Sequence, residues 1–139
     1  MQEIVQQIRD RATLEQFQDW LKQLPQDAII GIPKDPCDCP IAKYFRVTVS
    51  LPPFPKTSIS VRDFAVLLTS EGANGYERNW VFKDYCKLPK NTPRVPFWIK
   101  LVIKNVDAEE DENISVARML EIAEEVAIAL NETDSWNNH

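Results

Sequence analysis

Two of the three cysteines stand one residue apart, at what the sequence predicts to be the start of a helix. Cys37 and Cys39 flank Asp38, and Pro40 follows them. A cysteine at a helix N-terminus has a lowered pKa because the helix dipole favours the thiolate, although a neighbouring carboxylate opposes this effect. The segment is therefore a candidate thiol site. A structural role, as a helix cap and a small buried side chain, is the alternative interpretation.

The same cysteines are candidate metal ligands. Cys37, Cys39 and Cys86 supply three thiolates, whereas structural zinc sites have four ligands. The only histidine, His139, is the last residue and therefore a poor fourth ligand. The Cys-x-Cys spacing is also tighter than the usual spacing in zinc sites. A thiol or metal protein therefore stays an alternative, and we expect no cofactor.

A second candidate site lies in residues 76–104, where aromatic and basic side chains are interleaved. Proteins that bind single strands without reading sequence stack bases on aromatic rings and neutralise phosphates with cations. The candidate residues for such a site are Arg78, Trp80, Lys83, Tyr85 and Lys87. An isoelectric point near 4.9 counts against this function, because nucleic-acid-binding domains are typically basic. Nucleic acid is therefore an alternative partner and not the main expectation.

Charge is unevenly distributed along the 139 residues, which carry a net charge of −5. The net charge is −3 over residues 1–40, +7 over residues 41–104 and −9 over residues 105–139. Opposite charges within one fold attract each other. We therefore expect the acidic end to pack near the basic middle and to offset it.

The chain contains no known catalytic or nucleotide-binding motif. It lacks a P-loop, a dinucleotide-binding glycine pattern, a nucleophile elbow and a zinc-protease helix. The acidic run at residues 109–112 is typical of a solvated loop. No apolar run is long enough to span a membrane, and the first residues do not resemble a secretion signal. We therefore expect a cytoplasmic protein with reduced thiols, and an enzymatic activity is not indicated.

Several helices are predicted from periodicity and capping residues. Apolar residues recur at helical spacing over residues 2–10 and 14–24, and Thr13 forms a capping box with Gln16. A short helix should follow Cys39, with Pro40 as its first residue. Residues 97–106 suit either a strand or a helix, and we favour a helix because the run is long and lacks a turn signal.

Strand signals are fewer. Residues 46–51 alternate apolar and polar side chains, which predicts a strand. Ser60 and Asp63 match a second capping box, which predicts a helix that ends near Gly72. Residues 79–83 form a further predicted strand.

The last predicted helix has a wide apolar stripe. Its members are Val116, Met119, Leu120, Ala123, Val126, Ala127 and Leu130. Such a stripe must be covered, and we expect the rest of the chain to cover most of it. We expect Leu120 and Val126 to be buried, and Ile122 and Ile128 to form the edge that contacts a second copy of the chain.

Two segments resemble a group of small uncharacterised bacterial proteins. Residues 39–45, Cys-Pro-Ile-Ala-Lys-Tyr-Phe, resemble a helix motif of that group, and residues 97–107 resemble its later helix ending in Val-Asp. The resemblance implies a bacterial cytosolic origin and supports the helix at 97–106. It implies no activity.

Together these patterns predict an α+β fold: one mostly helical domain over residues 1–131, with a small β element near residues 46–51 and a frayed tail over residues 132–139. The favoured function is non-catalytic binding or regulation through contacts with a protein partner or with a second copy of the chain.

Overall fold

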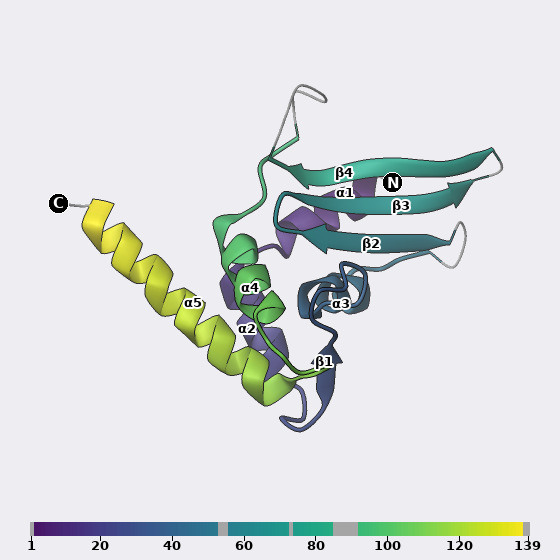
Figure 1. Ribbon diagram of the computed structural model, residues 1–139. Helices are drawn as coiled ribbons and strands as arrows, with labels where there is room; N and C mark the ends of the chain where they lie inside the picture. Colours follow the sequence, from purple (N-terminus) through teal and green to yellow (C-terminus); the bar gives the residue numbers. More distant parts are fainter. Residues whose placement is uncertain (1, 53–55, 73, 85–91, 138–139) are drawn as a thin grey trace.

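The computed structural model describes residues 2–52, 56–72, 74–84 and 92–137, and for residues 133–137 it describes the backbone alone. The described residues form an α+β fold with five helices and two antiparallel sheets (Figure 1). In chain order the elements are α1 (Gln2–Asp10), α2 (Leu14–Lys22), β1 (Ile29–Gly31), α3 (Pro40–Thr48), β2 (Thr57–Arg62), β3 (Ala65–Gly72), β4 (Gly75–Lys83), α4 (Phe97–Asp107), β5 (Ile114–Ser115) and α5 (Val116–Asn137). None of the helices in the described ranges has the length and hydrophobicity that crossing a membrane requires.

The N-terminal helices and α4 confirm the predictions made from capping and periodicity. The Oγ1 atom of Thr13 accepts a hydrogen bond from the backbone N–H of Gln16 at 3.2 Å, as the N-cap of α2. Cys39 is the N-cap of α3 and Pro40 is its first residue. The ambiguous run 97–106 is helical in α4. For α2 and α3 a local signal at the helix start agrees with the burial of one face.

The predicted strand at residues 46–51 is wrong, because α3 continues through Thr48. Val47 is 60% exposed, whereas Tyr44 and Phe45 are buried. The helix that begins at Cys39 buries these two aromatic side chains, and this burial outweighs the short alternation of valines. The five strands of the described residues, β1 to β5, all lie outside residues 46–51.

The predicted helix after Ser60 is also wrong, because this segment forms the β2–β3 hairpin. Ser60 pairs with Leu67 and Arg62 with Ala65, which leaves Asp63 and Phe64 as a two-residue turn. Ile59 and Val61 alternate with polar residues, so a strand buries both on one face. This alternation outweighs the capping-box pattern. The strand predicted at 79–83 is confirmed as part of β4.

The core lies between the helices and one face of the β2–β3–β4 sheet. Phe17, Tyr44 and Trp98 form an aromatic cluster. The ring centroid of Phe17 lies 5.3 Å from that of Tyr44 and 5.5 Å from that of Trp98. The polar tips of the cluster are satisfied, since the Tyr44 hydroxyl donates to the Arg11 carbonyl at 2.8 Å and the Trp98 indole to the Ala12 carbonyl at 3.0 Å. The cluster therefore fixes α2, α3 and α4 against one another.

Helix α5 packs against α2 and α4 and, within the described residues, has no extensive contact with β2, β3 or β4. Figure 1 shows it leading away from the sheet. The acidic end therefore lies near α4 but does not cover the cations of the sheet, so the expected charge compensation holds only in part. The helix also continues past residue 132, where we expected its end, to Asn137.

Candidate functional site

The candidate site is built around the loop of residues 32–39, which connects β1 to α3. The backbone N–H of Ile32 donates to the carbonyl of Asp38 at 2.9 Å, which closes the loop. Gly31 allows this close approach, because a Cβ atom there would lie 2.7 Å from the Cδ atom of Pro40. A residue with a side chain at position 31 would push the loop away from the start of α3.

The loop is stiffened from within and bound to the sheet. The Oδ1 atom of Asp35 accepts hydrogen bonds from the backbone N–H groups of Cys37 at 3.1 Å and Asp38 at 3.3 Å. The carbonyl of Pro36 accepts from the N–H of Val61 at 2.9 Å, on the edge of β2. These bonds hold the loop beside the end of β2.

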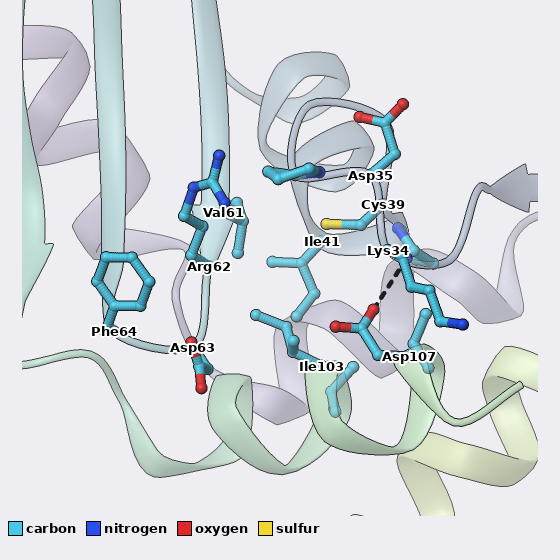
Figure 2. A pocket seen from close by; sticks show the side chains of 14 residues that line it. Lys34, Asp35, Cys39, Ile41, Val61, Arg62, Asp63, Phe64, Ile103 and Asp107 are labelled. Carbon is cyan, nitrogen blue, oxygen red and sulfur yellow. Dashed lines mark hydrogen bonds between the residues drawn. The ribbon is translucent and has the colours of Figure 1, made fainter.

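A third contact binds the loop to α4. Lys34 has a φ angle of 67°, in the left-handed region that non-glycine residues rarely adopt. In this conformation its backbone N–H donates to the Oδ1 atom of Asp107 at 2.9 Å (Figure 2). Segments that are far apart in the sequence thus meet at one place.

A pocket of about 160 Å³ lies between the loop, the β2–β3 turn and α4 (Figure 2). Its floor is apolar and includes Ile41, Val61 and Ile103, with Phe64 at the margin. Its rim is charged, with the cations Lys34 and Arg62 and the anions Asp35, Asp63 and Asp107. A pocket with an apolar floor and a few polar groups at its edge is the usual form of a binding site.

The Cys39 thiol lies at the base of this pocket and is buried. Its Sγ atom accepts a hydrogen bond from the Ala42 N–H at 3.5 Å. Burial raises the pKa of Cys39 to about 11, although backbone hydrogen bonds at the helix start act in the opposite direction. The thiol is therefore protonated near neutral pH, and the expected activation by the helix dipole is outweighed by desolvation. Cys37, by contrast, is exposed.

Within the described residues, Cys37 and Cys39 do not form part of a metal site. Among the described residues, no group of three or more histidine, cysteine or acidic side chains is arranged to hold a metal ion. Cys37 and Cys39 are both free thiols. Cys86 lies outside the described residues.

Three of the predicted nucleic-acid-binding residues lie on one strand. Arg78, Trp80 and Lys83 belong to β4, and the Lys83 ammonium lies 4.3 Å from the centroid of the Trp80 ring. Tyr85 and Lys87 lie outside the described residues. This strand is separate from the pocket, since none of these three residues lines it.

The expected contact edge on α5 is wrong for one of its two residues. Ile122 is fully buried within the chain, while Ile128 is 49% exposed. Val126 is buried as expected, whereas Leu120 is only partly buried. The buried face of α5 includes Ile122, so it is rotated slightly from the predicted stripe. Ile128 alone stays a candidate contact.

Sequence patterns missed the rim of the pocket. Lys34, Arg62, Asp63 and Asp107 belong to three separate segments, and no spacing along the chain relates them. The only local signal was the proline-flanked pair Lys34 and Asp35, which indicates an ordered loop.

No protein-family model, curated protein or solved structure significantly matches this chain. Its function must therefore be inferred from its own geometry.

Proposed function

We propose that this protein is a non-catalytic, cytoplasmic binding protein that recognises a segment of a partner protein through the pocket beside loop 32–39. The observation that carries the proposal is the apolar, charge-rimmed pocket itself. The free thiols of Cys37 and Cys39 support a reducing compartment.

The size of the pocket favours a single side chain as its occupant. Its volume of about 160 Å³ is close to that of an engineered cavity of about 150 Å³ that accommodates benzene. Small-molecule and cofactor sites are larger, at roughly 300–1,000 Å³. A leucine, methionine or phenylalanine side chain therefore fits, whereas a nucleotide is too large.

The rim supports recognition of the residues next to that side chain. Arg62 and Asp63 are exposed and adjacent at the hairpin turn, while Lys34 and Asp107 lie across the pocket (Figure 2). Charges of both signs pair with charged neighbours and with the backbone of a bound segment. Such exposed pairs add specificity more than affinity.

The proposal is tested by selecting peptides from a random phage-displayed library on the purified protein and measuring the affinity of the enriched peptides by fluorescence polarisation. We expect enriched peptides to share one bulky apolar residue. Phe64→Ala should weaken their binding about tenfold. Phe97→Ala is the matched control, since Phe97 is also exposed but lies outside the pocket.

A second pair of variants tests peptide binding at the pocket without changing Phe64. Ile103→Arg should fill the pocket and abolish binding, whereas Val47→Arg introduces the same charge at an exposed position of α3. Circular dichroism verifies that each variant is folded. Enriched peptides without a shared apolar residue, or equal binding by all four variants, would overturn the proposal.

A further inference from the structure

The outer face of the β2–β3–β4 sheet is a second surface, separate from the pocket floor. The inner face buries apolar side chains, among them Ile59, Leu68 and Val81. Helix α1 packs against β4 and α3 against β2. Within the described residues no helix covers the opposite face, which is seen from the front in Figure 1. Side chains on that face are available to a partner.

Strand β4 places aromatic and basic side chains in alternation on this outer face. Tyr76, Arg78 and Trp80 stand at every second position, opposite Glu71, Thr69 and Leu67 of β3. Successive side chains of a strand point to opposite faces, so these three point the same way. Tyr76 is 74% exposed, which leaves its ring free for stacking.

A shallow hollow of about 250 Å³ lies beside the Tyr76 ring. Lys56 and the hydroxyl-bearing residues Ser58 and Thr69 contribute to its lining, together with the carboxylate of Glu71. Lysine and hydroxyl groups are common partners of phosphate and sugar oxygens. The hollow therefore continues the polar surface from β4 across to β2.

Within the described residues, the acidic helix α5 makes no extensive contact with the strands of this face. Helix α5 packs against α2 and α4, away from the sheet, as stated above. Its own cation, Arg118, pairs with Glu109 at 2.6 Å and Glu121 at 2.9 Å. Screening in physiological salt limits charge effects to about 8 Å. The net charge of the whole chain is therefore a poor guide to the sheet face.

We infer that the outer face of the sheet, centred on Tyr76, Arg78 and Trp80, binds single-stranded nucleic acid. The exposed ring of Tyr76 and the half-buried ring of Trp80 offer stacking to unpaired bases, and Arg78 and Lys56 neutralise phosphates. A duplex keeps its bases stacked internally and gains nothing from the rings. An acidic peptide would use the cations but not the Tyr76 ring.

The contact between Lys83 and Trp80 does not prevent stacking. A cation–π contact at an exposed site is weaker than the stacking of a base on an aromatic side chain. A base that stacks on Trp80 therefore competes with the ammonium of Lys83 for the ring.

The inference is tested with a fluorescein-labelled strand of about 12 thymidines, titrated at roughly 50 and 200 mM salt and followed by anisotropy. We expect salt-dependent binding that Tyr76→Ala weakens about tenfold. Arg78→Glu should also weaken it, whereas Lys22→Glu is the matched control, because Lys22 is exposed on α2. Glu71→Gln should tighten binding, since it removes the carboxylate beside Tyr76.

Two results would overturn the inference. The first is an absence of binding to the labelled strand at low salt. Binding that a polyglutamate peptide competes equally well, and that Tyr76→Ala leaves unchanged, would also overturn it, because the face would then attract any polyanion. Neither result affects the pocket proposal, which Phe64 and Ile103 test separately.

Discussion

The backbone N–H of Lys34 donates to the side-chain Oδ1 atom of Asp107 at 2.9 Å, across 73 positions of sequence. This hydrogen bond joins the loop before α3 to the last residue of α4. It thereby sets the distance between two walls of the pocket. The bond also accompanies the left-handed backbone of Lys34, whose φ angle is 67°.

We expect Asp107→Ala to lower the free energy of unfolding by about 1 kcal/mol, because one partly exposed hydrogen bond is lost. The larger effect should be local, as faster amide hydrogen exchange at Lys34. Asp107→Asn keeps a carbonyl acceptor and should retain slow exchange. Asp111→Ala is the control for loss of an exposed acid. Unchanged exchange at Lys34 in Asp107→Ala would show that the bond does not hold the loop.

Cys39 should make stability depend on pH in the alkaline range. Its pKa is raised from 9.0 to about 11 in the folded protein, so the unfolded chain loses this proton first. The contribution is fully present below pH 9 and is lost as the pH rises towards 11. Two pKa units correspond to roughly 2–3 kcal/mol.

Urea titrations from pH 8 to pH 11 measure this loss, and Cys39→Ala should reduce the slope. Tyr44, whose pKa burial raises to about 12, contributes to the slope in both proteins and cancels in the comparison. In a Cys86→Ser background, iodoacetamide at neutral pH should modify Cys37 well before Cys39. Equal slopes, or faster modification of Cys39, would refute the buried, protonated thiol.

Two isoleucines of α5, Ile122 and Ile128, allow the burial of this helix and a contact with a second copy to be tested separately. Ile122→Glu should reduce the free energy of unfolding by about 4 kcal/mol or more, because it places a charge in the core. Ile128→Glu should change it by less than about 0.5 kcal/mol. If a second copy docks on this helix, Ile128→Glu should also shift the mass measured by light scattering towards the monomer. A stably folded Ile122→Glu protein would contradict the burial of this residue.

The sequence predicted the helices well because their signals are local. Thr13, Cys39 and Pro40 define helix starts within a few residues, and periodic burial extends each helix. The same local rules failed at residues 46–51 and after Ser60, where two patterns competed and tertiary burial decided between them. Asp63, the acid of the false capping box, lies at the hairpin turn and on the rim of the pocket.

The pocket could not be predicted, because it depends on contacts between distant segments. Nothing in the local sequence relates Lys34 to Asp107 or Pro36 to Val61. The sequence did indicate an alternation of aromatic and basic residues in β4. The sequence alone could not show which face of the sheet carries these residues. It also could not show that α5 packs elsewhere and leaves this face uncovered.

The most direct test of the central claim is a methyl NMR titration with N-acetyl-leucinamide, which mimics one side chain of a partner segment. Burial of a leucine side chain contributes roughly 1.5–3 kcal/mol, which corresponds to a Kd of roughly 6–80 mM. We predict saturable shifts of the methyl groups of Ile41, Val61 and Ile103, which line the pocket. Exposed methyl groups of Val47 and Ile128 should not shift. Equal shifts at those exposed positions, or no shifts within the pocket, would contradict the account.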